Sequence, residues 1–141
     1  MTPARIYMTT FYGQVKAKKN NKQIARRANG QPFIRTSTET KAQENMMVQA
    51  FTIERLQQQF HKDQIEDKDI EIEIDFYNSD EHRHDLDNQL ATVMDALVRA
   101  EVLPDDNQKV VRKETVTYKG LDKEDPRAEI TIKAYNRRKE K

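Results

Sequence analysis

The chain has 141 residues, of which 35% are hydrophobic and 35% are charged, and its formal net charge is +1. This length is typical of one domain, and the small apolar fraction indicates a thin core that association with a second copy would help to stabilise. The absence of cysteine excludes disulfides and thiolate metal sites. We find neither a run of 18 apolar residues nor a signal-peptide pattern, so we expect a soluble protein of the cytoplasm.

Charges are segregated along the chain. Residues 1–38 hold eight Lys or Arg and no acidic residue, whereas residues 60–106 hold fifteen acidic and four basic residues. Residues 107–141 return to eleven basic against six acidic residues. Such segregation predicts a polyanion on the basic ends and a cation held by the acidic centre.

The first elements predicted are a strand and a hairpin. Residues 4–13 are rich in β-branched and aromatic residues, which indicates a strand that ends at Gly13. Asn29-Gly30 stands between two short extended segments and is typical of a two-residue type I′ turn, whose central residues need positive φ. The segment between the strand and this turn is called the basic arm, because it holds six cations without an intervening acid: Lys16, Lys18, Lys19, Lys22, Arg26 and Arg27.

We expect the basic arm to bind a nucleic-acid backbone. Lysine and arginine neutralise phosphates, and the interleaved Asn20, Asn21 and Gln23 can donate to phosphate or sugar. The alternative is an edge hairpin that lysine protects from aggregation. Six cations exceed what that protection needs, which favours nucleic acid.

A long amphipathic helix is predicted over residues 39–60, after a sequence at Thr36 to Glu39 that resembles a capping box. Its apolar face is expected to hold Met46, Ala50, Ile53, Gln57 and Phe60. We expect this face to pack in the core, with a groove for a partner as the alternative.

The centre of the chain predicts a strand followed by a second helix. Residues 69–77 alternate strictly, with Ile70, Ile72, Ile74 and Phe76 on the face expected to be buried. After a polar loop, the helix is expected to start near Asp87 or Asn88 and to stop before Pro104. Its core residues are expected to be Leu90, Val93, Met94 and Leu97.

Two further strands complete the predicted fold. They cover residues 108–118 and 127–135, and the second alternates Ala128, Ile130 and Ile132 toward the core. The tail, residues 136–141, is expected to fray. Neither repeats nor a linker are evident, so we predict a single domain over residues 1–141. Its class is α+β, with a mixed or antiparallel sheet and two main helices.

Carboxylates gather at the start of the second helix. Asp85 and Asp87 lie two apart in an extended segment, so their side chains share one face about 6.5 Å apart along the chain. Asn88 and Asp95 lie seven residues apart, at nearly the same angle after two helical turns. Oxygen ligands of this kind suit hard divalent cations, and Mg²⁺ typically takes one or two carboxylates with waters and substrate phosphate.

Asp105 and Asp106 follow this helix and precede the next strand. If that strand pairs beside the one before the helix, the turn can return to Asp85 and Asp87. Taken singly, Asp87 is an ordinary N-cap and the Asp105–Asp106 pair an ordinary turn. Their combination in order along the chain indicates a metal site.

Other chemistries fit the sequence less well. An EF-hand loop beginning at Asp85 would need Gly and Glu where Leu90 and Ala96 stand. His82 and His84 remain alternative ligands for a transition metal, although we expect them to be solvated or to face phosphate. A metal site and a basic arm on one chain together predict hydrolysis of a phosphodiester.

With these features the chain resembles the RusA-type Holliday junction resolvases, a phage-associated family of structure-selective endonucleases. The resemblance covers residues 12–135 and rests on GQVKAKKNNKQI with PFIRTS, on DLDNQLATVMDAL and on LPDDNQKV. It implies a Mg²⁺- or Mn²⁺-dependent homodimer without an organic cofactor, which nicks opposed strands of a four-way DNA junction. It also implies a bacterial host in which the protein is nucleoid-associated or phage-encoded.

By position, the resemblance implies roles for individual residues. Asp85, Asp87 and Asp106 would be catalytic and would bind the metal, with Asp95 as a further acidic position that supports them. Asn88 and Asp105 would support these residues structurally. DNA would contact Arg83 and His84 as well as the basic arm.

Two positions depart from the family pattern. Ala91 stands where the family usually has a lysine that faces the metals, and His84 stands where a basic residue, typically arginine, precedes the first aspartate. Two alternatives to the endonuclease therefore stay open. One is a protein of the same fold that binds branched DNA without cutting it. The other is a small nucleotide hydrolase, for which the basic arm would be superfluous.

Overall fold

The structure, a computed structural model, describes residues 2–16, 22–26, 28–29, 31–36, 38–81 and 84–137. Its elements follow in the order β1 (Arg5–Tyr12), β2 (Lys22–Arg26), β3 (Pro32–Thr36), α1 (Thr38–Gln57), the short 3₁₀ helix η2 (Lys62–Gln64), β4 (Lys68–Asn78), α2 (Leu86–Arg99), β5 (Val111–Leu121) and β6 (Arg127–Asn136). The predicted α+β class with two main helices is confirmed. None of the helices in these ranges is long and apolar enough to cross a membrane.

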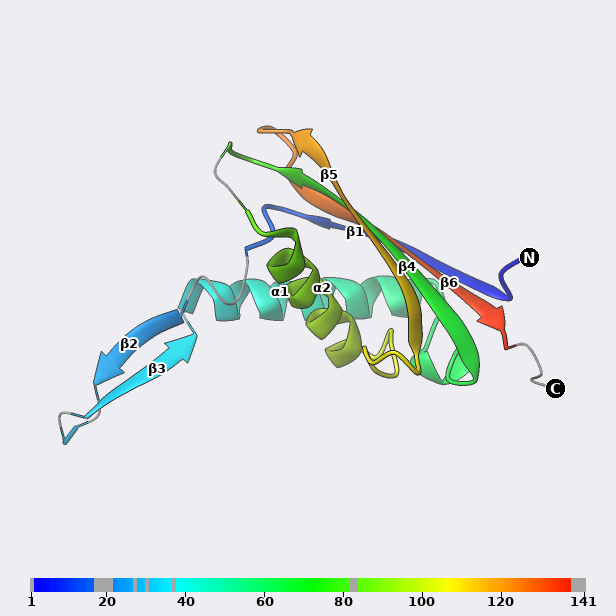
Figure 1. The fold of residues 1–141 in the computed structure, drawn as a ribbon, viewed down its shortest axis with the longest axis horizontal. Coiled ribbons are helices and arrows are strands. Elements are labelled where there is room, and N and C mark those ends of the chain that lie inside the picture. Colours follow the sequence, from blue (N-terminus) through cyan, green and yellow to red (C-terminus); the bar gives the residue numbers. More distant parts are fainter. Residues whose placement is uncertain are drawn as a thin grey trace.

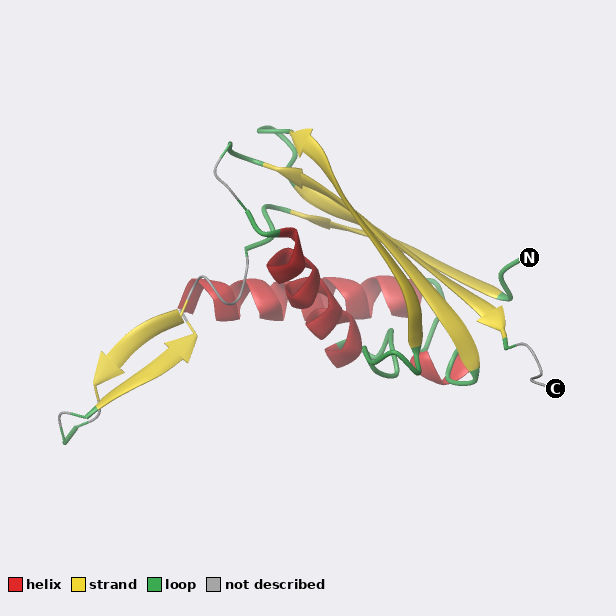
Figure 2. Ribbon diagram, viewed as in Figure 1, coloured by secondary structure: helices red, strands yellow, loops and turns green. Residues whose placement is uncertain are grey.

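A four-stranded sheet of order β1-β6-β4-β5 forms the body of the molecule (Figure 1). β6 is antiparallel to both β1 and β4, whereas β5 is parallel to β4. The parallel pair is possible because α2 connects the two strands, and parallel neighbours need a crossover of a dozen or more residues. The sheet is therefore mixed, and both main helices lie on the same face of it (Figure 2).

The core lies between this face of the sheet and the helices. Every second residue of β4, from Ile70 to Phe76, is fully buried, as the alternation predicted. The predicted inward residues of β6 are buried beside them. From α2 the core receives Val93, Met94 and Leu97, while Leu90 is only half-buried.

α1 buries a different face from the one predicted. Met47 and Phe51 are fully buried, whereas Met46 is 60% exposed and Ile53 is 49% exposed. Apolar residues occur on both sides of this helix, so their spacing alone does not decide which side meets the sheet. The predicted apolar face was therefore wrong by about one residue.

The end of α1 also differs from the prediction. The helix stops at Gln57 rather than at residue 60, and Gln59 has a positive φ of 54° that turns the chain. Phe60 consequently enters the core from outside the helix, with its ring centroid 5.1 Å from that of Tyr7. The capping box expected at the start of this helix involves side chains outside the described residues.

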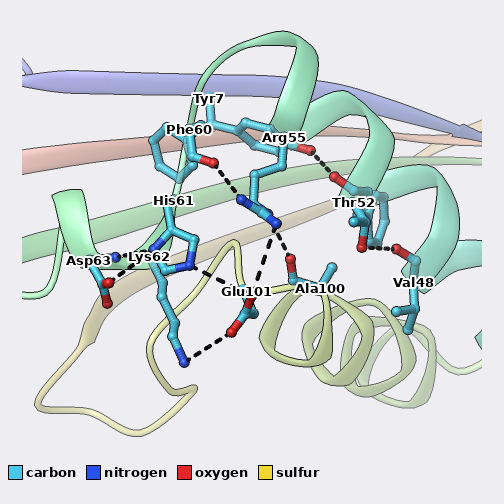
Figure 3. A network of polar contacts seen from close by, with 11 residues as sticks. Tyr7, Val48, Thr52, Arg55, Phe60, His61, Lys62, Asp63, Ala100 and Glu101 are labelled. Carbon is cyan, nitrogen blue, oxygen red and sulfur yellow. Dashed lines mark hydrogen bonds and ion pairs between the residues drawn. The ribbon is translucent and has the colours of Figure 1, made fainter.

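A polar network ties this turn to the C-terminal end of α2 (Figure 3). Arg55 donates from Nε to the carbonyl of Ala100 at 3.0 Å and from Nη1 to the carbonyl of Phe60 at 3.2 Å. It thereby satisfies a carbonyl that the end of a helix leaves without an internal partner. The carboxylate of Glu101 lies 4.0 Å from Arg55, 3.6 Å from His61 and 3.8 Å from Lys62.

The hairpin β2–β3 follows the start of the basic arm and projects from the body next to the beginning of α1 (Figure 1). Its strands are antiparallel with Arg26 opposite Pro32, which confirms the predicted hairpin. The predicted two-residue turn at Asn29-Gly30 includes Gly30, which lies outside the described residues, so this turn stays a prediction. Between the two strands, Asn29 Oδ1 accepts the N–H of Gln31 at 3.1 Å.

The remaining boundaries shift by a few residues. α2 begins at Leu86, earlier than predicted, and ends before Pro104 as expected. β5 covers residues 111–121 rather than 108–118, and β6 continues through Asn136, which was assigned to the frayed tail. Residues 138–141 lie outside the described part of the chain.

Candidate active site

Asp85 and Asp87 lie together at the N-terminal end of α2. Asp85 has extended backbone, with φ −89° and ψ 115°, and its Oδ1 accepts the N–H of Asp87 at 3.0 Å. Asp85 is thus the N-cap, a role that the sequence suggested for Asp87. Both aspartates are exposed, and their negative charges lie at the positive end of the helix dipole.

One exposed stripe of α2 carries the acidic positions. Asp87, Ala91 and Asp95 follow one another at intervals of four residues, and all three are exposed. Eight residues of helix separate Asp87 from Asp95 by about 12 Å along the axis. A single ion bound at about 2.1 Å cannot contact both carboxylates over that distance. Along α2, Ala91 lies between them with only a methyl side chain.

Asp106 lies within the electrostatic reach of Asp95. Desolvation raises the pKa of the Asp106 carboxyl, and its hydrogen bond with the Asp105 side chain and the negative charges of Asp105 and Asp95 raise it further. The pKa of Asp105 is lowered, chiefly because its Oδ1 accepts the N–H of Asp106 at 2.7 Å. Three carboxylates therefore interact at this place, and the crowding favours either a proton or a cation there.

The parallel pairing of β4 and β5 separates the two acidic groups. Val111 at the start of β5 pairs with Ile70 at the start of β4, while the loop that leads to Asp85 follows the other end of β4. The Asp105–Asp106 turn therefore lies near Asp95, in the C-terminal half of α2, and not near Asp85 and Asp87 at its N-terminal end. Among the described residues, no group of three or more acidic or histidine side chains is close enough to hold one ion. A metal shared by Asp85, Asp87 and Asp106 stays a prediction.

A hollow of about 270 Å³ opens beside Asp106. Two cations, Arg112 and Lys113, line it together with Gln108, Val111 and Glu114. The register between β4 and β5 shifts at this point, so that Arg112 is the extra residue of a bulge. Bulges redirect side chains, and here the bulge places the Arg112 guanidinium beside the hollow that Asp106 lines. Its Nε also lies 3.5 Å from Oδ1 of Asp69 on β4. Neither cation was among the site residues predicted from the sequence.

The predicted DNA contacts are only partly visible. His84 is half-buried, with Nε2 2.9 Å from Oδ1 of Asp80, and Lys16 is half-buried at the base of the basic arm. Asn88 is half-buried, and its backbone carbonyl accepts from the Thr92 hydroxyl at 3.0 Å, so the role predicted for its side chain stays a prediction. Lys22 and Arg26 lie on β2, but their side chains are outside the described part. The same holds for the whole of Lys18, Lys19, Arg27, His82 and Arg83.

Sequence reasoning missed a buried polar group at the base of the arm. Asn78, Gln89 and Thr92 are all buried, and Gln89 is completely so. One signal was present in the sequence: Gln89 precedes Val93 by four residues and Ala96 by seven, so it falls on the buried face of α2. A polar residue at such a position needs hydrogen-bond partners inside the protein.

Comparison with known proteins identifies the family. None of the curated proteins compared with the chain matches it. The family model described as endodeoxyribonuclease RusA matches residues 5–133, which spans from β1 into β6. The matched part includes the basic arm, the exposed stripe of α2 and the Asp105–Asp106 turn, and it confirms the resemblance seen in the sequence. The chain belongs to the RusA endodeoxyribonuclease family.

Proposed function

We propose that the protein is a homodimeric, Mg²⁺-dependent endodeoxyribonuclease that resolves Holliday junctions by cutting two opposed strands. Membership of the RusA family carries this proposal, since the family implies a junction-resolving endonuclease that acts on branched DNA. A two-fold dimer would offer one active site to each of two equivalent strands. The protein would act in the cytoplasm of a bacterial host, on cellular or phage DNA.

The carboxylates of α2 and of the following turn suit a hard divalent cation. Mg²⁺, or Mn²⁺ in its place, needs only one or two carboxylates when waters and substrate phosphate complete its shell. Asp106 and Asp95 supply oxygen donors whose mutual repulsion a cation would relieve. Asp85 and Asp87 supply further donors, and the capping bond uses one of the Asp85 oxygens. When bound, the metal supplies charge stabilisation at the phosphoryl group and a more acidic water.

The basic residues would hold the DNA backbone. The basic arm includes β2, one strand of the hairpin that projects from the body, so it can reach phosphates away from the cutting site (Figure 1). Arg112 and Lys113, beside the hollow at Asp106, would contact phosphates closer to it. Contacts to phosphate position a duplex without reading its sequence, which suits selection of branched shape.

Ala91 supports a second candidate, a junction-binding protein that does not cut. This residue is exposed between Asp87 and Asp95, where the family usually has a lysine. Without that charge, stabilisation of the phosphoryl group would depend on other cations, such as Lys16 or Arg112. A nucleotide hydrolase is disfavoured because it would have no use for the basic arm.

Metal-dependent cleavage tests the proposal. The wild type, Asp87→Asn and Asp106→Asn are compared for cutting of a synthetic junction in Mg²⁺, in Mn²⁺ and in EDTA. We expect the wild type to cut in Mg²⁺ and in Mn²⁺ but not in EDTA. Both variants should lose cutting and keep their affinity for the junction. Tight binding without cutting in either metal would favour the second candidate. Replacing Lys18, Lys19 and Lys22 by Ala should abolish action on DNA; a variant that still hydrolyses free nucleotides would favour the hydrolase.

A further inference from the structure

Five polar side chains surround the first residues of the basic arm. They are called the glutamine clamp here and comprise Gln14, Gln43, Asn78, Gln89 and Thr92. They come from the arm itself, from α1, from the end of β4 and from α2. Asn78, Gln89 and Thr92 are 5%, 0% and 1% exposed, so these three lie inside the protein, whereas Gln14 and Gln43 are half-buried.

The clamp holds the backbone of residues 14–16 from both helices. From α1, Gln43 accepts the N–H of Lys16 at 2.8 Å and donates to the carbonyl of Gln14 at 2.5 Å. From α2, Gln89 donates to the carbonyl of Val15 at 3.1 Å, and the Thr92 hydroxyl lies 3.2 Å from the carbonyl of Lys16. The N–H of Lys16, the first cation of the arm, is therefore held by the clamp, and its carbonyl lies next to the Thr92 hydroxyl.

The clamp also joins the arm to the end of β4. Asn78 Oδ1 accepts from Gln14 Nε2 at 3.0 Å and from Gln89 Nε2 at 3.1 Å. Gln14 Oε1 in turn accepts the N–H of Ser79 at 2.6 Å and its hydroxyl at 3.1 Å. Ser79 begins the loop that leads to Asp85, so one network fixes the base of the arm and both ends of this loop.

Packing alone does not account for Gln89. Its Oε1 is buried without a hydrogen-bond partner among the described residues, which carries an energetic cost that leucine would avoid. A connected buried network, by contrast, restricts the relative orientation of the elements that it joins. Gln89 directly follows Asp87 and Asn88, so the same turn of α2 carries a metal-binding candidate and the contact to the arm.

We propose that the glutamine clamp sets the position of the basic arm relative to the carboxylates of α2, so that phosphates bound by the arm place the scissile phosphodiester beside those carboxylates. This inference rests on the proposed function. Gln89 is a positioning residue in this scheme, because it acts through Val15 and Asn78. Loss of the clamp should therefore affect where and how fast the DNA is cut more than how tightly it is bound.

The variant Gln89→Leu tests the proposal, since leucine has a similar size and lacks the two donated hydrogen bonds. We expect the affinity for a synthetic four-way junction to stay within about 3-fold and the single-turnover cutting rate to fall at least about 10-fold, because small misplacements are costly in rate. We also expect cuts to spread to neighbouring phosphodiesters. Gln58→Leu is the control, because it removes a side-chain hydrogen bond to the Met8 carbonyl just beyond the C-terminal end of α1, whereas Gln43 of the clamp lies near the start of that helix.

Cutting by Gln89→Leu at wild-type positions and rate would overturn the proposal. If wild type itself does not cut the junction, the proposed function fails, and amide hydrogen exchange then decides on the clamp alone. Exchange of the Lys16 amide should be at least about 10-fold faster in Gln43→Ala, because this variant removes the oxygen that accepts that N–H. Gln43 is half-exposed, so this variant also tests the clamp if Gln89→Leu does not fold. Unchanged protection of that amide would overturn the proposal.

Discussion

Asp85 combines two roles that substitutions can separate. Its Oδ1 caps α2 through the N–H of Asp87 at 3.0 Å, and its carboxylate is a candidate metal ligand. Asp85→Ala removes both, and loss of an N-cap costs about 1 kcal/mol, within a range of about 0.5–2 kcal/mol. Asp85→Ser and Asp85→Asn keep an oxygen that caps, so they should cost only a few tenths of a kcal/mol. For a chain of this length, 1 kcal/mol corresponds to a change in Tm of about 3 °C.

Urea denaturation and junction cutting, measured on the same three variants, test this reasoning. Cutting should fall about 100-fold or more in all three, since even residues that only support a metal ligand are worth about 10–100-fold. Stability should fall measurably in Asp85→Ala alone. Wild-type cutting by Asp85→Ser would show that the carboxylate takes no part in the reaction. Equal stability of Asp85→Ala and Asp85→Ser would refute the capping argument.

Three further predictions concern other parts of the molecule. Arg55→Met should lower the free energy of unfolding by about 2–3 kcal/mol, because it leaves two buried carbonyls without a charged donor; a loss below about 0.5 kcal/mol in urea denaturation would contradict this. Burial raises the pKa of Tyr7 to about 12. The folded state therefore keeps this hydroxyl protonated after the unfolded state has lost its proton, so stability should fall by up to about 1.4 kcal/mol per pH unit between about pH 10 and 12. This pH dependence of the stability should be absent in Tyr7→Phe, as urea denaturation at pH 9 and at pH 11 would show. Ala91→Lys should stabilise α2 by a few tenths of a kcal/mol through ion pairs with Asp87 and Asp95. It should also speed junction cutting in single-turnover assays, because it adds a positive charge near the phosphoryl group. Slower cutting would contradict the idea that a positive charge at residue 91 promotes the reaction.

Much of the fold follows from local patterns. Strict alternation in β4 and β6 predicted their buried faces because a strand that is half-buried has a period of two. The same reasoning fails for α1, where Met46 and Met47 are adjacent and only contact with the sheet decides that Met47 is buried.

The candidate site was only partly within reach of the sequence. The helix period predicted Asn88 and Asp95 on one face of α2, and in the structure Asp95 is exposed while Asn88 is half-buried. The position of Asp106 depends on the direction of β5, which local sequence patterns do not contain. In the structure Asp106 interacts with Asp95 and Asp105. The glutamine clamp depends on contacts between residues more than 60 apart, such as Gln14 with Asn78.

The most direct test of the whole account is cutting of a synthetic four-way junction and of a linear duplex with the same sequence in Mg²⁺, with each strand labelled in turn. We predict paired nicks in two opposed strands of the junction and little cutting of the duplex by the wild type, and no cutting of either DNA by Asp87→Asn. Equal cutting of junction and duplex, or cutting that Asp87→Asn retains, would contradict it.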